Sequence, residues 1–219
     1  MKIIFEDRLE AGQFLASKLI HYAHRTDVIV LGLPRGGVPV AYQVAQSLHA
    51  PLDVFIVRKL GVPGYEELAM GAIATGGVRV FNKEILRSME LPKEEVEAVV
   101  HREYQELVRR EKLYRGDRPA PHIKGQIAML VDDGLATGAS MWAAVVALRR
   151  FDPAKIVVAV PVAAEQTCAI FRREVDEIVC GMTPEPFMAV GIWYRNFSQT
   201  TDEEVRDYLQ RASEGALTT

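Results

Sequence analysis

The stretch VDDGLATGAS, residues 131 to 140, places two adjacent carboxylates between an apolar run and a turn of small residues. Asp132 and Asp133 repel each other, and carboxylates resist removal from water, so a purely structural role would be costly for them. Residues 136 to 140 have little side-chain bulk, which leaves their backbone N–H groups accessible. We therefore interpret this junction as a ligand site.

Short apolar runs rich in β-branched residues alternate with helical patterns along the chain, and continuous apolar runs are typical of parallel strands covered on both faces. The expected strands are Val28–Leu33, Leu52–Val57, Ile127–Val131, Ile156–Val160 and, with a weaker pattern, Val175–Cys180. The expected helices are Arg8–His24, Val38–Leu48, Ser140–Arg150 and Glu165–Arg173. Such alternation with right-handed crossovers predicts an α/β fold, a doubly wound and mainly parallel sheet with helices on both faces.

Two regions interrupt the alternation within what we expect to be one domain over residues 1–219. Residues 82–118 are charged and carry an apolar stripe, which predicts one or two inserted helices. Residues 181–212 contain prolines and aromatic residues followed by an acidic helix, Asp202–Arg211, and predict a C-terminal hood over the end of the sheet. Ser213–Thr219 are expected to be disordered.

Composition and charge restrict the class of protein. Of 219 residues, 49% are hydrophobic and 25% charged, with a net charge of −3, which favours a soluble domain and argues against a general nucleic-acid binder. No apolar run approaches the roughly 20 residues needed to cross a membrane, and the N-terminus lacks the apolar region of a signal peptide. Cys168 and Cys180 fit no metal-site spacing and are expected to be reduced core residues. The prediction is a cytoplasmic protein that binds neither nucleic acid nor membranes.

The position of the acid pair, after a strand and before a helix, indicates what it binds. Ligands of open α/β sheets lie beyond the carboxyl ends of the strands. A small-residue loop at a helix start offers N–H groups and the positive end of the helix dipole, which suit phosphate. Carboxylates accept hydrogen bonds from vicinal hydroxyls or approach a hydrated Mg²⁺. The implied ligand is a sugar phosphate with a free diol, and the alternative is an ordinary junction capped by Thr137 or Ser140.

The sequence AMLVDDGLATGAS, residues 128 to 140, resembles the phosphoribosyl-diphosphate signature of the type I phosphoribosyltransferases, with the acid pair and the Thr-Gly pair in register. The resemblance implies that Asp132 and Asp133 hold the ribose 2- and 3-hydroxyls. It assigns the 5-phosphate to the turn made by Ala136, Thr137, Gly138, Ala139 and Ser140.

Two further stretches support the resemblance. LPRGGVP, Leu33–Pro39, has neither the P-loop nor the dinucleotide glycine pattern, but its paired glycines suit close approach of the backbone to an anion. The resemblance makes Arg35, Gly36 and Gly37 the pyrophosphate loop.

The second stretch, VRKLGVPGYEELAMG, Val57–Gly71, resembles the basic pair and mobile catalytic loop of adenine- and orotate-specific members. It implies that Arg58 and Lys59 bind pyrophosphate and act in catalysis, and that the irregular segment Gly61–Met70 closes over the site. Glu67 is the candidate for protonating or orienting the base.

The acceptor base is left open. The hypoxanthine-guanine branch has an acid at the position of Ala136 and a lysine shortly after the next strand, whereas Pro161–Glu165 contain none. Ala136 therefore suits adenine-like and orotate-like members better. The aromatic residues that either cover the base or form the core of the hood are Phe187, Trp193 and Tyr194.

The resemblance predicts a Mg²⁺-dependent pentosyltransferase of nucleotide salvage and nucleoside metabolism. It would transfer the 5-phosphoribosyl group from phosphoribosyl diphosphate to a nitrogenous base and release pyrophosphate. No direct metal ligand is assigned, and Asp132 and Asp133 would hold the ion through water. One alternative is a regulator that binds the donor without transfer. A second is a phosphosugar hydrolase using the acid pair with metal, which leaves the two basic stretches unexplained; a homodimer is left open.

Overall fold

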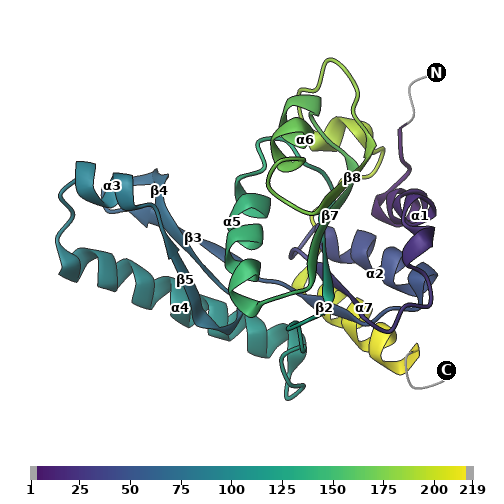
Figure 1. The fold of residues 1–219 in the computed structure, drawn as a ribbon, viewed down its shortest axis with the longest axis horizontal. Helices are drawn as coiled ribbons and strands as arrows, with labels where there is room; N and C mark the ends of the chain where they lie inside the picture. Colours follow the sequence, from purple (N-terminus) through teal and green to yellow (C-terminus); the bar gives the residue numbers. More distant parts are fainter. Residues whose placement is uncertain (1–3, 216–219) are drawn as a thin grey trace.

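The computed structural model describes residues 4–215, and its centre is a five-stranded sheet in the order β2-β1-β6-β7-β8 (Figure 1). All neighbouring pairs in this sheet are parallel, which confirms the predicted mainly parallel α/β fold. The strands are β1 (Val28–Gly32), β2 (Leu52–Val54), β6 (Ile127–Val131), β7 (Lys155–Val162) and β8 (Glu177–Met182).

Helices cover both faces of this sheet, and strand alternation explains the apolar runs. Val28 and Val30 of β1 pack toward α1 (Arg8–Lys18) and α2 (Gly37–Leu48). The intervening residues Ile29 and Leu31 pack into the cluster on the other face, which contains α5 (Ala139–Leu148) and α6 (Glu165–Phe171). Because successive side chains of a strand point to opposite faces, a strand covered twice is apolar at every position.

A second, antiparallel sheet, which the sequence analysis did not predict, extends to one side of the first (Figure 1). Its strands are β3 (Val57–Val62), β4 (Tyr65–Ala74) and β5 (Val78–Phe81). Two helices follow, α3 (Lys83–Ser88) and α4 (Lys93–Arg115), as expected for the insertion. We call residues 57–115 the arm. α4 packs on β3 and β4, while α5 of the main body also contacts all three arm strands.

The prediction of an irregular segment over Gly61–Met70 is wrong, because most of it belongs to a β-hairpin. Only Pro63 and Gly64 lie between β3 and β4, and Gly64 has φ +77°, which glycine adopts at no steric cost. The glycine and proline therefore mark a tight turn between strands. The pairing is interrupted around Gly61, where the register shifts.

Several boundaries differ from the expected ones. Val57 begins β3 instead of ending β2, and the opening helix ends at Lys18, followed by a short 3₁₀ turn over Ile20–Tyr22. The last helix, α7 (Asp202–Gly215), includes residues 213–215, so the expectation of disorder is wrong for them. Residues 216–219 lie outside the described part of the chain.

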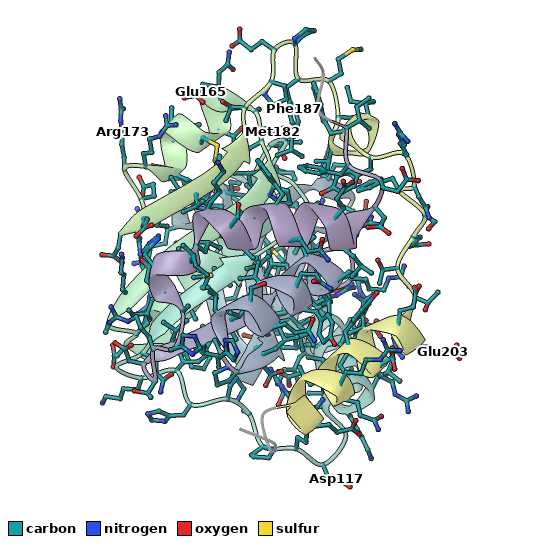
Figure 2. All side chains as sticks on the ribbon, turned by 90° about the vertical axis from the view of Figure 1, so that its right-hand side faces the viewer. Asp117, Glu165, Arg173, Met182, Phe187 and Glu203 are labelled. Carbon is teal, nitrogen blue, oxygen red and sulfur yellow. A yellow bond between two sulfur atoms is a disulfide. The ribbon has the colours of Figure 1, made fainter. Side chains whose placement is uncertain are left out.

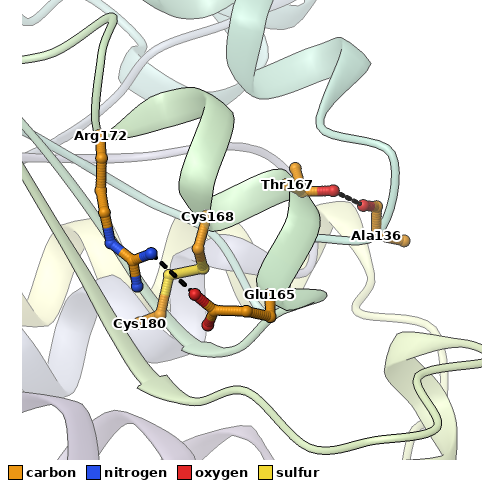
Figure 3. The surroundings of a disulfide bond; sticks show 6 residues. All are labelled: Ala136, Glu165, Thr167, Cys168, Arg172 and Cys180. Carbon is orange, nitrogen blue, oxygen red and sulfur yellow. Dashed lines mark hydrogen bonds and ion pairs between the residues drawn. A yellow bond between two sulfur atoms is a disulfide. The ribbon is translucent and has the colours of Figure 1, made fainter.

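Cys168 and Cys180 form a disulfide, so the expectation of two reduced core cysteines is wrong (Figure 3). Cys168 lies in α6 and Cys180 in β8, and α6 is the crossover that connects β7 to β8. This packing brings their Cα atoms to 6.9 Å across a separation of 12 residues. Spacing along the sequence did not reveal the pairing because the crossover, not a local turn, brings the two thiols together.

The segment expected to form a hood runs from the end of β8 to α7, and its two halves lie apart. Phe187 lies near the exit of β8 at Met182, whereas Glu203 lies on α7 at the opposite side of the molecule (Figure 2). α7 packs against α2 and α4. Among residues 4–215, no helix combines the length and the apolar character needed to cross a bilayer.

Candidate active site

Strands β1 and β6 of the parallel sheet end side by side, and this places the two predicted anion loops next to each other. Gly32 of β1 is in register with Val131 of β6, which is in register with Ala159 of β7. The N–H of Leu33 donates to the carbonyl of Val131 over 2.9 Å, so the loop after β1 runs beside the acid pair. The structure therefore brings together the segments carrying Arg35-Gly36-Gly37 and Asp132-Asp133.

The two glycines after Arg35 are required by this close approach. A Cβ at Gly37 would lie 2.6 Å from the carbonyl oxygen of Val131 and 2.8 Å from Cα of Asp132, and one at Gly36 would overlap Oδ2 of Asp133. Any side chain here would push the loop away from the acids. The peptide bond between Pro34 and Arg35 is cis, and a guanidinium nitrogen of Arg35 lies 3.8 Å from Asp202 at the start of α7.

The acid pair is partly buried and only partly neutralised. Burial raises the pKa of Asp132 well above its ordinary range, and the charge of Asp133 adds to this shift. Burial also raises the pKa of Asp133, although the guanidinium of Arg8 acts in the opposite direction. Inside the pair, the N–H of Asp133 donates to Oδ1 of Asp132 over 2.9 Å. Two carboxylates with a single nearby guanidinium favour a ligand that brings hydroxyl donors or a cation.

The turn predicted to bind the 5-phosphate has the expected position, because β6 ends at Val131 and α5 begins at Ala139. Gly138 precedes the helix with φ +78°, and none of the described side chains caps the helix start. The alternative of a junction capped by Thr137 or Ser140 is therefore wrong. Both hydroxyl residues are exposed, as are Ala136 and Ala139. Convergence of the N–H groups of residues 137–140 on one point stays a prediction.

Supports from α6 and β7 hold this turn, and the sequence analysis missed them. The N–H of Leu135 donates to the carbonyl of Val162 at the end of β7 over 2.9 Å. The hydroxyl of Thr167 donates to the carbonyl of Ala136 over 2.5 Å (Figure 3). Thr167 is next to the disulfide residue Cys168 in α6. The crossover helix α6 thus holds the phosphate turn in place through Thr167, and no local sequence pattern predicts this contact.

The two predicted basic residues of β3 point to opposite faces of the arm, as neighbours on a strand do. Arg58 faces α4, where its Nη2 lies 2.6 Å from Oε2 of Glu103. Lys59 is on the other face and is exposed, with Nζ 3.4 Å from Oε2 of Glu67. Both cations therefore already have acidic partners. The predicted catalytic residue Glu67 is itself fully exposed on β4.

A cavity of about 590 Å³ lies between the arm and the main body, beside the phosphate turn. Strands β4 and β5 form one wall, which includes Ala72, the cross-strand partner of Lys59. The opposite wall contains Thr137, Gly138 and Ala139 together with α5 and α6. The face of the arm that carries Lys59 is thus turned toward the phosphate turn, whereas Arg58 faces α4 on the other side.

The aromatic residues predicted for the hood pack beneath the acid loop. Trp193 and Tyr194 are buried in one cluster, and Phe187 packs against it. The hydroxyl of Tyr194 donates to the carbonyl of Asp133, and burial raises the pKa of Tyr194, which keeps the donor protonated. A Cβ at Gly134 would collide with Val190. These residues therefore pack against the acid loop and support it. Their contact with a base stays a prediction.

Arg8 is the charged residue of the site that sequence reasoning missed. Its Nε lies 2.8 Å from Oδ2 of Asp133, and its Nη1 donates to the carbonyl of Ser198 over 2.7 Å. Arg8 begins α1 and is 125 residues from its acidic partner, so no motif or spacing connects them. Among the described residues, no group of three or more His, Cys, Asp or Glu side chains could hold a metal ion.

Comparison with known proteins agrees with this geometry. The family model of the phosphoribosyl transferase domain matches residues 4–179. The chain belongs to the phosphoribosyl transferase family. This match covers the parallel sheet through the first half of β8, the arm and both anion loops.

Two provisionally named phosphoribosyl transferases of Mycobacterium tuberculosis, from strains CDC 1551 and H37Rv, are each 48% identical over 209 residues, 95% of this chain. The chain spans about half of these relatives, 47% of their length. The solved structure of protein TT1426 from Thermus thermophilus is 41% identical with a TM-score of 0.84, covering 95% of this chain and 98% of that one. This likeness extends the shared fold over nearly the whole chain, including the arm.

Proposed function

We propose that this phosphoribosyl transferase moves the 5-phosphoribosyl group from phosphoribosyl diphosphate to a nitrogenous base. One observation carries the proposal: an acid pair and an uncapped, exposed helix start lie within one loop at the carboxyl edge of the sheet. The acids suit the ribose diol, and the turn suits the 5-phosphate. The glycine loop packs directly against the acids, so a pyrophosphate bound by its backbone would lie next to the proposed diol site.

The protein groups act by positioning and by charge. Asp132 and Asp133 would accept hydrogen bonds from the ribose hydroxyls, while the N–H groups of residues 137–140 hold the 5-phosphate. Ribose C1 then lies toward Arg35 and the glycine loop, where the leaving group departs. Charge on the pyrophosphate grows as its bond to C1 breaks, so cations that approach at that stage accelerate the step. Lys59 shares a face of the arm with Ala72, which lines the cavity opposite the phosphate turn, and it is the cation we assign to this role.

The acid pair also fits a magnesium ion carried in by the donor. Mg²⁺ keeps several waters and is held by one or two carboxylates plus substrate phosphates, and two carboxylates without a third ligand are the set present here among the described residues. Such an ion would neutralise pyrophosphate oxygens and approach the acids through water. Arg8 already occupies one oxygen of Asp133, which leaves the other oxygen and Asp132 for these contacts.

A second candidate is a regulator that binds the donor without transfer. The observation that favours it is the pairing of both arm cations, Arg58 with Glu103 and Lys59 with Glu67. In a transferase the arm must exchange these partners for pyrophosphate, whereas a regulator keeps them. The two functions are separated by turnover, not by donor affinity.

The test is a panel of purines, pyrimidines and simple analogues, incubated with phosphoribosyl diphosphate and Mg²⁺ while pyrophosphate release is measured. We expect release with at least one base. Asp132→Asn combined with Asp133→Asn should weaken donor binding by about a hundredfold, because two hydrogen bonds to charged acceptors are weakened. Asp117→Asn, on an exposed loop, serves as the matched control. Tight donor binding without release from any base would replace transfer by the regulator function, and unchanged affinity in the folded double variant would remove the donor site.

A further inference from the structure

Arg8 occupies a position where four distant segments of the chain meet. It begins α1, contacts Asp133 after β6, and donates to Ser198 in the C-terminal segment. The Cβ position of Gly36 in the glycine loop lies 3.3 Å from its Nε. Its guanidinium carbon lies 4.0 Å from the centre of the Phe197 ring. Only 11% of the Arg8 side chain is exposed, so this cation is built into the site and is not a surface charge.

The contact with Asp133 determines how that carboxylate is presented. Arg8 Nε donates a hydrogen bond to Oδ2 of Asp133 over 2.8 Å, and the side chain of Asp133 is 16% exposed. A carboxylate fixed through one oxygen offers the other oxygen in a defined direction. The stacked Phe197 ring and the carbonyl of Ser198 in turn hold the guanidinium, so its own position is fixed. Without Arg8, Asp133 would lose the cation that pairs with it, and its charge would repel that of Asp132 without compensation.

We infer that Arg8 is a positioning residue for recognition of the ribose diol, and that it links the C-terminal segment to the acid pair. The inference rests on the proposed donor site and adds to it the residue that makes the acids selective for a diol. Arg8 has no contact with the phosphate turn of residues 136–140 among the described hydrogen bonds. Its effect should therefore appear with ligands that carry the diol and be absent with phosphate alone.

The experiment compares two probes by calorimetry: ribose 5-phosphate, which carries phosphate and diol, and inorganic phosphate, which carries no diol. The variant is Arg8→Gln. The matched control is Arg25→Gln, because Arg25 also pairs with an aspartate, Asp27, but at the exposed surface. We expect Arg8→Gln to lower affinity for ribose 5-phosphate about tenfold and to change affinity for inorganic phosphate less than twofold. Arg25→Gln should change neither.

Two further variants keep the inference testable if Arg8→Gln folds poorly. Arg8→Lys retains the charge but not the fork that reaches Asp133 and Ser198 together, and should restore part of the selectivity for ribose 5-phosphate. Phe197→Leu removes the stacked ring and leaves the charges in place, so it should lower selectivity less than Arg8→Gln does. Thermal unfolding of each variant confirms that it is folded at the temperature of the titration.

Three results would overturn the inference, and they are distinguishable. Unchanged or tighter binding of ribose 5-phosphate by folded Arg8→Gln shows that Arg8 does not position the acids. Equal weakening of ribose 5-phosphate and inorganic phosphate shows a structural role in the loop as a whole. If the unaltered protein binds inorganic phosphate but does not prefer ribose 5-phosphate, the proposed donor site itself fails, and the inference about Arg8 fails with it.

Discussion

The edge of the parallel sheet carries an acid pair and the arm carries a basic pair. The acids have fewer oppositely charged partners than they need, whereas each basic residue has its own. At the sheet edge, Asp132 and Asp133 are adjacent, partly buried and only partly neutralised, because the guanidinium of Arg8 pairs with Asp133. In the arm, Arg58 and Lys59 are adjacent in sequence but point to opposite faces, and each has its own carboxylate. The repulsion between the two acids is thus relieved only when a ligand binds, whereas both basic residues form ion pairs without a ligand.

This contrast suggests a division of work between the two regions. A site whose charges are held by surrounding structure is preorganised, and preorganisation raises affinity because less has to be ordered when the ligand binds. Lys59 can exchange its fully exposed partner Glu67 at low cost, since surface ion pairs contribute only about 0–1 kcal/mol, whereas Arg58 is paired with the buried Glu103. We therefore expect changes at the sheet edge to act on stability and donor affinity, and changes in the arm to act on rate.

The largest expected effect concerns the disulfide, which belongs to the sheet-edge region alone. Reduction of Cys168–Cys180 should lower the free energy of unfolding by about 3 kcal/mol, because the bond closes a short loop in the unfolded chain. Urea unfolding with and without a phosphine reductant measures the difference. Hydrogen exchange should rise in α6 and in residues 132–140, which α6 supports through Thr167, and stay unchanged in the arm.

The double variant Cys168→Ser with Cys180→Ser is the control for that measurement, since reductant should not affect its unfolding. A thiol assay under denaturing conditions must show that the bond in the unaltered protein was intact and was then reduced. If complete reduction leaves the unfolding midpoint in place, the disulfide does not constrain this region.

The next effect tests the arm. Lys59→Ala should lower kcat about tenfold and change donor affinity less than twofold, because charge on the departing pyrophosphate develops mainly in the transition state. Steady-state kinetics and donor titrations give the two quantities separately. Lys93→Ala, at the exposed start of α4, is the matched control. Equal losses in rate and affinity would mean that Lys59 only contributes uniform binding.

The difference between the regions also explains what the sequence predicted. At the sheet edge, the apolar run Ile127–Val131, the acids and the small turn each have one physical solution, so strand end, loop and helix start were predicted within a residue or two. In the arm, the glycines and proline of residues 61–64 are compatible with either a loop or a hairpin, and pairing between β3 and β4 on both sides of them decides the outcome. Long-range partners such as Arg8 with Asp133 leave no local pattern, and neither does the disulfide.

A smaller effect measures the cost of the acid pair. Burial raises the pKa of Asp132 in the folded protein above the ordinary value of about 3.9, so the stability contributed by its proton is present below about pH 4 and lost as pH rises through the folded pKa. Asp132→Asn does not titrate. It should match the unaltered protein near pH 4 and exceed it at pH 7 by on the order of 1 kcal/mol. Urea unfolding across this range checks the prediction, with Asp117→Asn showing no such trend.

The smallest expected effect asks whether the arm cations are held back by their partners. Glu103→Gln keeps the shape of the side chain but removes the charge that holds Arg58, whose Nη2 lies 2.6 Å from Oε2 of Glu103. Freed from this partly buried pair, Arg58 should bind pyrophosphate more readily, raising affinity by no more than about fivefold, about 1 kcal/mol, because the side chain must still turn away from α4 to reach the ligand. Calorimetric titration with pyrophosphate measures the change, and added salt should diminish it.

Glu97→Gln is the matched control, because Glu97 lies on the same helix and pairs with another arm arginine, Arg79, at 3.4 Å. If both variants raise pyrophosphate affinity equally, the gain comes from net charge alone. If neither does, Arg58 faces α4 for structural reasons, and the recruitment of arm cations rests on Lys59.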